Sequence, residues 1–351
     1  MQGSNFGKAF QITTFGESHG KGLGVIIQGC PPGISLDEET IQKALDKRKP
    51  GNSISSTRRK EPDVPIFYSG IFEGKTTGTP LMILINNKDA ESKSYEETAR
   101  LFRPGHGDYT YQAKYGIRDY RGGGRSSARE TAARVSAGAV AQLILDQQGI
   151  CITSYTLEIG GIKAENITEI WRKDDNDLQC PDPKMAQQMS KCISQVKADG
   201  DSLGGVVEIR ASGVPKGLGE PVFDKLDADI AKAFMSIGAV KAVEIGEGCH
   251  APKLSGFENN DQITEQGFET NHSGGILAGI SNGEDIIARV HVKPIPSILR
   301  EQQTLDKDGN SAVISTKGRH DICAIPRINK VCEAMLAITL ADHYLRQKAN
   351  I

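Results

Sequence analysis

Two distant stretches of the sequence repeat one order of local structure, and this repeat limits the folds that the chain can adopt. Residues 25–45 run from an apolar strand through a glycine–proline–glycine turn into a helix, and residues 206–233 do the same. Short apolar runs that end at such turns predict strands, whereas apolar residues three and four positions apart predict helices. The repeat favours an α+β fold with a duplicated unit, although turn chemistry alone can produce the same pattern.

Two capping-box pairs mark where helices should begin. Ser35 and Glu38 precede a helix that should end near Lys49, and Ser127 and Glu130 precede a longer helix. The small residues of the longer helix indicate close packing inside the protein. The periodicity predicts further elements, namely helices over 127–148, 185–196, 223–235 and 331–345, and strands at 25–27, 81–85, 206–209 and 286–292.

Composition is typical of a folded globular protein and excludes several function classes. Hydrophobic residues make up 38% of the 351 residues and charged residues 25%. The 42 basic and 44 acidic residues give a net charge of -2, so no protein-wide basic field steers the chain onto nucleic acid. Any basic site must therefore be local. No run approaches ~18 apolar residues, so we expect no membrane span.

Cysteine content and the first residues indicate the cytoplasm. The seven cysteines include no Cys-x-x-Cys pair, which favours scattered reduced thiols over disulfides or a zinc site. The N-terminus lacks the apolar core of a secretory signal. No proline-rich or low-complexity segment divides the chain, so we expect one domain over residues 1–351.

A histidine stands within the small-residue run Gly16–Gly20. His19 should therefore lie on a tight loop, where it can reach a ligand, and imidazole exchanges its proton near neutral pH. General acid–base catalysis is one interpretation. A surface-turn histidine is the other, and it is the usual outcome for a lone histidine.

The segment from Arg103 to Arg134 is the richest in candidate site residues. Seven basic side chains face three acidic ones here, within a chain that is net acidic. Gly122–Gly124 lead into the predicted helix, whose free N-terminal amides and dipole favour a phosphate or carboxylate. Arg125 and Arg129 would add bidentate contacts. We interpret the segment as an anion site.

Two other interpretations of this segment stay open. Four of the chain's eight tyrosines fall here, and arginine interleaved with tyrosine can form a nucleic-acid surface on which bases stack. Alternatively, the glycines and arginines only build a solvated loop. A P-loop kinase is disfavoured, because no Gly-x-x-x-x-Gly-Lys-Ser/Thr run occurs.

Two C-terminal segments add candidates. Arg319, His320 and Asp321 lie close to Arg327, a pattern that is common in surface salt-bridge clusters. Residues 293–297 follow the last predicted strand, and their prolines stiffen a loop in a way that is also compatible with holding a flat ring.

Together these motifs resemble the signatures of the chorismate synthase family. The resemblance rests on Gly16–Gly20, Arg103–His106, Arg125–Thr131 and Gly318–Asp321, in matching order and separation, and it covers nearly the whole chain. It implies a β-α-β sandwich of antiparallel sheets around central helices, assembled as a homotetramer. The duplicated pattern described above is consistent with that fold.

The resemblance also implies an activity. Members of this family are lyases that convert 5-enolpyruvylshikimate-3-phosphate to chorismate and phosphate by anti-1,4-elimination, the last common step of aromatic amino acid biosynthesis in the shikimate pathway. Reduced FMN is required without net redox change. No reductase domain is visible, so we expect an external flavin reductant. An RNA-binding protein and an ordinary flavin oxidoreductase are the alternative functions.

The resemblance assigns roles to individual residues. His19 is similar to the histidine near the leaving phosphate, His106 to the one that protonates reduced flavin, and Asp321 to the acid that assists flavin N5 in accepting a proton. The expected substrate contacts are Arg48, Arg103, Arg129 and Arg319. The expected flavin contacts are Arg125, Ser126, Ser127, Gly238, Ala239, Ala278, Lys293, Pro294, Ile295, Pro296, Ser297 and Arg319.

The chain departs from the family pattern at three positions. Ile54 stands where many relatives carry an arginine, on a loop that contacts substrate, or NADP in relatives thought to bind nicotinamide. Gly238 is often asparagine in relatives, and Ala278 is often glycine. Backbone contacts survive both of these changes, whereas a side-chain contact at Gly238 does not.

Overall fold

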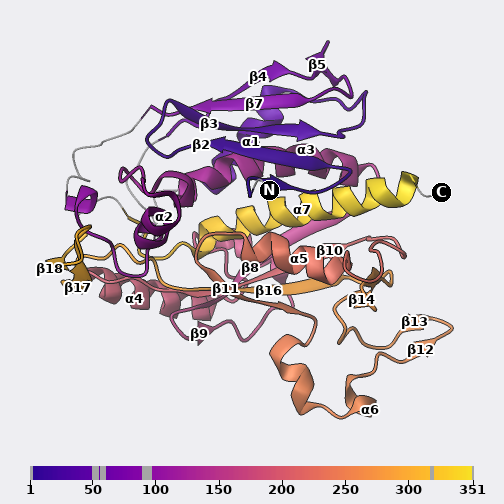
Figure 1. Ribbon diagram of the computed structural model, residues 1–351. Helices are drawn as coiled ribbons and strands as arrows, with labels where there is room; N and C mark the ends of the chain where they lie inside the picture. The colour runs from indigo at the N-terminus through magenta and orange to yellow at the C-terminus, as the bar shows by residue number, and fades with distance from the viewer. Residues whose placement is uncertain (1–2, 50–54, 56–60, 89–96, 317–319, 350–351) are drawn as a thin grey trace.

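Two antiparallel sheets enclose a layer of helices in the computed structural model, which describes residues 3–49, 55, 61–88, 97–316 and 320–349 (Figure 1). The first sheet has the order β1 (Asn5–Phe6), β2 (Gln11–Gly16), β3 (Gly22–Gln28), β7 (Leu81–Asn86), β4 (Pro65–Ser69). The second has the order β11 (Val240–Ile245), β16 (Ile286–Val292), β10 (Gly205–Ser212), β8 (Cys151–Ile159), β9 (Ile162–Lys163). The helices are α1 (Glu38–Arg48), α2 (Asp108–Tyr115), α3 (Thr131–Asp146), α4 (Pro183–Ala198), α5 (Leu226–Met235), α6 (Gly256–Asn259) and α7 (Ile325–Ala349). The predicted α+β class is confirmed.

The two halves of the chain follow the same path. In the first half β2, β3, α1, β4, β7 and α3 succeed one another, and the sheet order is β2-β3-β7-β4. In the second half β8, β10, α5, β11, β16 and α7 succeed one another, and the order is β8-β10-β16-β11. Every neighbouring pair is antiparallel in both sheets. The predicted internal duplication is therefore present, and the loops that lead into α3 and α7 occupy equivalent places.

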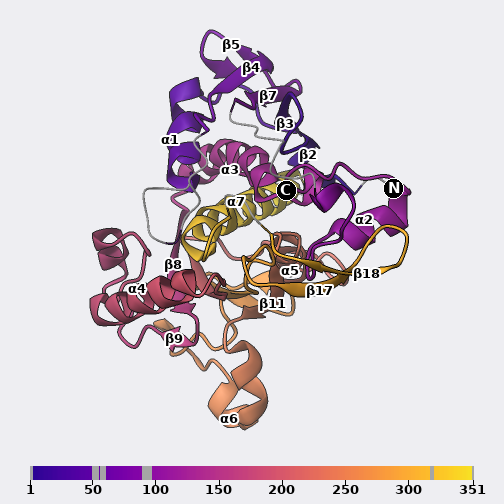
Figure 2. The ribbon, with the colours of Figure 1, turned by 90° about the vertical axis from the view of Figure 1, so that its left-hand side faces the viewer.

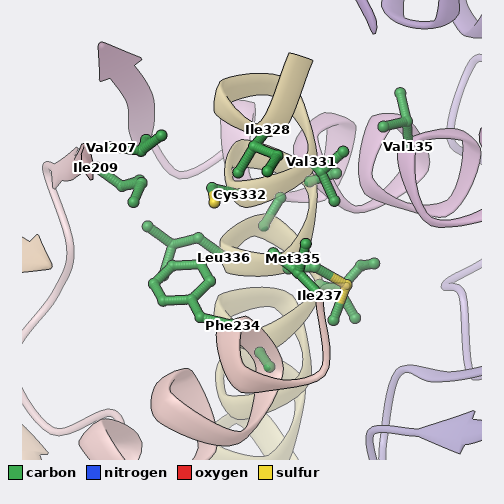
Figure 3. Close-up of a cluster of buried hydrophobic side chains, with 14 of the residues drawn as sticks. Val135, Val207, Ile209, Phe234, Ile237, Ile328, Val331, Cys332, Met335 and Leu336 are labelled. Carbon is green, nitrogen blue, oxygen red and sulfur yellow. The ribbon is translucent and has the colours of Figure 1, made fainter. Parts of the chain in front are cut away.

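Helix α7 lies in the middle of the molecule and is buried along most of its length. Figure 3 shows Cys332 and Leu336 of α7 beside Val207 and Ile209 of β10 and Phe234 of α5, all of them almost fully buried. Alternate residues of a strand face one side of a sheet, so β10 presents its apolar side to α7. The burial of these apolar side chains is the main stabilising contribution to the sandwich.

Helices α3 and α7 cross at a glycine. A Cβ atom added to Gly138 of α3 would lie 2.4 Å from Cβ of Ala334 and 2.5 Å from its Cα. Ala133, Ala137 and Ala141 of α3 are also fully buried. The predicted close packing of this helix is confirmed.

Two helix starts were predicted wrongly. Asp37, not Ser35, caps α1, because its side chain accepts a hydrogen bond from the backbone nitrogen of Thr40 at 2.8 Å. Helix α5 begins at Leu226 rather than near Phe223, whose side chain is 92% exposed. In both cases the apolar spacing predicts the helix but does not determine which nearby residue begins it.

The second predicted capping box is also wrong. Ser127 does accept a hydrogen bond from the backbone nitrogen of Arg129, and residues 128–130 form a 3-10 turn before α3. Glu130, however, accepts hydrogen bonds from Thr14 and Arg134 instead of returning to Ser127. Its carboxylate is therefore used to tie α3 to the first sheet.

The remaining short elements lie around the sandwich. Residues 248–275 extend as an arm below the second sheet in Figure 1. The two-stranded hairpins are β5 (Ile71–Phe72) with β6 (Lys75–Thr76), β12 (Ile263–Thr264) with β13 (Gly267–Phe268), β14 (Ile276–Leu277) with β15 (Ile280–Ser281), and β17 (Gln302–Leu305) with β18 (Ser311–Ile314). Among the described residues, no helix combines the length and the apolar character that crossing a membrane requires.

We expect Gly138→Ala to lower the free energy of unfolding by about 1–3 kcal/mol, because its Cβ would overlap Ala334 and force the two helices apart. Helix propensity alone would favour alanine by ~1 kcal/mol, so a destabilising result isolates the packing effect. Urea denaturation measures it. Gly256→Ala is the control, since a Cβ there has no atom within 4 Å. Equal stability of the two variants would contradict the prediction.

Candidate active site

A pocket of about 1260 Å³ lies between the two halves of the chain. Its walls come from the β2–β3 loop, the end of α1, the segment between β7 and α3, the α5–β11 turn and the segment between β16 and α7. Figure 2, which looks from the side of α2, shows the segments that precede α3 and α7 meeting at this end of the molecule. The equivalent loops of the duplicated unit thus build one site.

The glycine run before α3 packs directly against both candidate histidines. A Cβ atom at Gly122 would lie 2.3 Å from Nδ1 and Cε1 of His19, and one at Gly123 would lie 3.0 Å from Cε1 of His106. Both glycines have positive φ, at 63° and 91°. Only glycine combines that conformation with so close an approach. His19 is 9% exposed, so it is a pocket residue and not a surface-turn histidine.

One buried carboxylate holds two arginines at the pocket. Asp63 is fully buried and accepts hydrogen bonds from Arg48, at 2.6 Å, and from Arg129. Although burial favours the neutral acid, the two guanidiniums hold the pKa of Asp63 below its ordinary value. Burial and the nearby Arg327 lower the pKa of Arg48 to about 10, so Arg48 stays charged at neutral pH.

These arginines keep donors for a further anion. Nε of Arg48 and Nη2 of Arg129 are buried and make no hydrogen bond with the described residues, although Nη2 of Arg129 lies 3.7 Å from the Glu61 carboxylate. Buried donors without partners are costly, so an anionic ligand that accepts from them would be bound strongly.

A second carboxylate, Asp108, organises another part of the pocket lining. Asp108 accepts two hydrogen bonds from the Arg103 side chain, at 2.7 and 2.9 Å, and one from Arg118 at 3.3 Å. Its Oδ1 also lies 3.1 Å from Nδ1 of His106. Although burial favours the neutral acid, Arg103 and His106 hold the pKa of Asp108 well below its ordinary value.

The second half of the chain closes the site. Nζ of Lys293 donates to the backbone oxygen of Gly105 at 2.5 Å, which joins the 293–297 loop to the histidine loop. Asp321 is buried and accepts from Arg327, so this pair is part of the pocket and not a surface cluster. Burial and Arg103 lower the pKa of His320 to about 4, which keeps its imidazole neutral.

Most of the residues predicted for the site line this pocket. They are His19, Arg48, Arg103, His106, Arg125, Ser126, Ser127, Arg129, Gly238, Ala239, Lys293, Ile295, Pro296, Ser297 and Asp321. Pro294 and Ala278 do not line it; Ala278 is exposed in the turn between β14 and β15, at a φ of 52° that favours glycine. Arg319 and Ile54 lie outside the described residues.

The surroundings of two predicted flavin contacts, Arg125 and Gly238, are defined by the chain itself. The Arg125 guanidinium donates to the backbone oxygens of Thr14 and Gly16 at 3.1 Å, so it braces the glycine run against β2. A Cβ atom at Gly238 would have no atom within 4 Å, so the pocket has open space beside this residue.

Sequence reasoning missed both organising carboxylates. Asp63 belongs to no motif, and 15 residues separate it from Arg48 and 66 from Arg129. Asp108 ends the Arg103–Asp108 run, and its place five residues after Arg103 was the signal that could have identified it. The nucleic-acid interpretation also loses its support, because Arg103 and Arg129 are 3% and 5% exposed and point inward. Among the described residues, no group of three or more His, Cys, Asp or Glu side chains is arranged to hold a metal ion.

Comparisons with known proteins agree on one family. The family model described as chorismate synthase matches residues 10–345. A chorismate synthase of Desulfosudis oleivorans is 63% identical over 350 residues, covering 99% of each chain, and one of Desulfatibacillum aliphaticivorans is 60% identical over 347 residues, covering 99% of this chain and 97% of that one. A crystal structure of chorismate synthase superposes with a TM-score of 0.77 at 34% identity, covering 97% of this chain and 93% of that one.

We expect Asp63→Asn to lower the free energy of unfolding by about 3–5 kcal/mol at pH 7, because Arg48 and Arg129 lose their buried counter-charge. Asp63 has a lowered folded pKa, so its contribution is present above the unfolded pKa of ~3.9 and is lost as pH falls through the folded value. The difference in the free energy of unfolding between wild type and variant should therefore become smaller below about pH 4. Urea denaturation between pH 3 and 7 measures it, with the exposed Asp177→Asn as control. If this difference did not change with pH, Asp63 would not be the buried counter-charge of Arg48 and Arg129.

Proposed function

Because the chain belongs to the chorismate synthase family, we propose that it converts 5-enolpyruvylshikimate-3-phosphate to chorismate and phosphate by anti-1,4-elimination with reduced FMN. This is the last common step of aromatic amino acid biosynthesis in the shikimate pathway. The observation that carries the proposal is the pocket itself, which combines the buried His19 and the half-buried His106 with arginines whose buried donors make no hydrogen bond with the described residues. A substrate with carboxylates and a phosphate matches those donors.

The size of the pocket supports two ligands side by side. Its volume of about 1260 Å³ exceeds the roughly 300–1,000 Å³ that pockets for one ligand occupy. At one wall the backbone of Gly122 and Gly123 packs against His19 and His106. Arg125, Ser126 and Ser127 follow this run along the pocket, where they would contact a flavin. When bound, reduced FMN supplies transient electron donation to the substrate ring without net redox change. Its proposed contacts are Arg125, Ser126, Ser127, Gly238, Ala239 and residues 293–297.

The chain's own residues would bind the anions and hold the protons. Arg48, Arg103 and Arg129 clamp the substrate, and burial strengthens each of these contacts because water competes less. His19 is the proposed general acid for the leaving phosphate. His106 and Asp321 are the proposed proton-holding groups on the flavin side of the pocket.

We also propose a single domain that assembles as a homotetramer. The buried apolar residues of both halves belong to one continuous core, which supports a single domain. The face of the first sheet that points away from α3 carries Phe15 and Leu84 on the two sides of Gly24, and Ile26 beside Met82. These four apolar side chains are only half-buried in the single chain, so a second copy is the proposed partner of this face.

Two further proposals concern the surroundings of the enzyme. An external reductant would supply the reduced flavin, since the sequence contains no recognisable reductase segment. A cytoplasmic location is proposed because all seven cysteines are free thiols, which a reducing compartment preserves.

We expect anaerobic incubation with 5-enolpyruvylshikimate-3-phosphate and chemically reduced FMN to release chorismate and phosphate in equal amounts, with the flavin still reduced at the end. Chorismate absorbance, a phosphate assay and the flavin spectrum measure this. Oxidised flavin in proportion to product would support the oxidoreductase alternative instead. A folded, flavin-binding chain that forms no product would sink the proposal.

Replacing both His19 and His106 with alanine should lower kcat by at least ~100-fold, because general acid–base groups contribute roughly 10²–10⁴-fold. Single-turnover assays with reduced FMN measure the effect. His250→Ala is the matched control, since His250 is an exposed histidine of the arm. Intact turnover in the double variant would remove both residues from the mechanism.

A further inference from the structure

Asp108 is a buried carboxylate that none of the proposed roles uses. It is the first residue of α2 and only 3% exposed. Arg103 binds it through the backbone nitrogen at 3.2 Å and through two side-chain nitrogens, and Arg118 binds it through Nη1. The positive end of the helix dipole further favours its charge. Asp108 is therefore fixed in place as an anion.

His106 meets this carboxylate with one edge of its ring and the glycine loop with the other. Nδ1 lies 3.1 Å from Oδ1 of Asp108, whereas Cε1 and Nε2 lie 3.0 and 3.1 Å from the position of a Cβ on Gly123. The contact is within hydrogen-bond distance, although Nδ1 does not meet hydrogen-bond geometry in the ligand-free chain. Because a carboxylate only accepts hydrogen bonds, this contact favours the proton of a neutral His106 on Nδ1. Nε2 is then the nitrogen that can exchange a proton with a ligand.

We propose that Asp108 is a positioning residue for His106: it fixes the Nδ1–H tautomer and aims Nε2 at the glycine wall of the pocket. The catalytic consequence of this arrangement rests on the proposed lyase function, whereas the tautomer does not. By holding Arg103 at the same time, Asp108 sets the distance between an anion-binding arginine and a proton-holding imidazole. A carboxylate behind a histidine is a general means of fixing both its tautomer and its orientation.

The charges around His106 determine how readily its imidazole is protonated. The groups that face the imidazole are Asp108, Arg103, Arg118 and His320. Burial lowers the pKa of His106, and the two arginines lower it further, while Asp108 opposes them. Asp108→Asn keeps the shape and removes the opposing charge, so the imidazole should become harder to protonate.

The test uses the full-length, ligand-free protein with ¹⁵N-labelled histidine and NMR, so it does not depend on turnover. His106→Gln identifies the His106 signals among the seven histidines. The wild type should show Nδ1 protonated and Nε2 unprotonated. In Asp108→Asn the tautomer should become mixed, and the His106 titration should move to lower pH by ~1 unit or more.

Asp261→Asn is the matched control, because Asp261 is also a buried carboxylate beside a histidine, His272, but lies in the arm far from the pocket. It should leave the His106 signals unchanged. Asp108→Glu retains the charge and should retain the titration, while its longer side chain displaces the ring. If the lyase is active, kcat should depend on pH through the protonation of His106. That part of the pH profile should shift to lower pH in Asp108→Asn.

Three results would overturn the inference. The first is an Nε2–H tautomer for His106 in the wild type, which requires no variant to fold. The second is an unchanged tautomer and titration in folded Asp108→Asn. The third is an equal change in Asp261→Asn, which would indicate a general loss of structure. Absence of lyase activity in the wild type would remove the proposed function and leave the tautomer result standing.

Discussion

The close crossing of α3 and α7 at Gly138 and Ala334 positions the segments that carry the site residues. Each helix ends one half of a duplicated unit, and each is preceded by a long segment that carries candidate residues. With no side chain at Gly138 the two helices approach closely, so these segments converge on one pocket. Lys293 then joins them through the backbone oxygen of Gly105.

Burying several arginines beside this pocket is costly unless each has a counter-charge. Asp63 and Asp108 provide it, and each carboxylate binds two guanidiniums. The arrangement holds the arginines in fixed positions before a ligand arrives, while leaving buried donors on Arg48 and Arg129. Preorganised donors in a dry site are the condition under which an anionic substrate is bound and its developing charge is stabilised.

The elements of the fold were largely predictable, because buried strands and helices impose periods of two and 3.6 on the sequence. The starts of α1 and α5 were not, since several polar residues precede each helix and local geometry selects among them. In the site, His19, His106 and the arginines were identified because they lie in glycine-rich runs with a family pattern. Ala278 lies in a turn that does not line the pocket, and its proposed flavin contact stays a prediction.

The sequence by itself determined the secondary structure, the duplicated strand–turn–helix unit and the segments that carry the chemistry, because each of these is written in residues close together along the chain. Tertiary structure alone decided that the loops before α3 and α7 share one pocket. It also decided that Gly122 and Gly123 touch both histidines, and that Asp63 joins Arg48 to Arg129 across intervals of 15 and 66 residues. Contacts of this kind arise from packing between distant elements, and no local period or spacing records them.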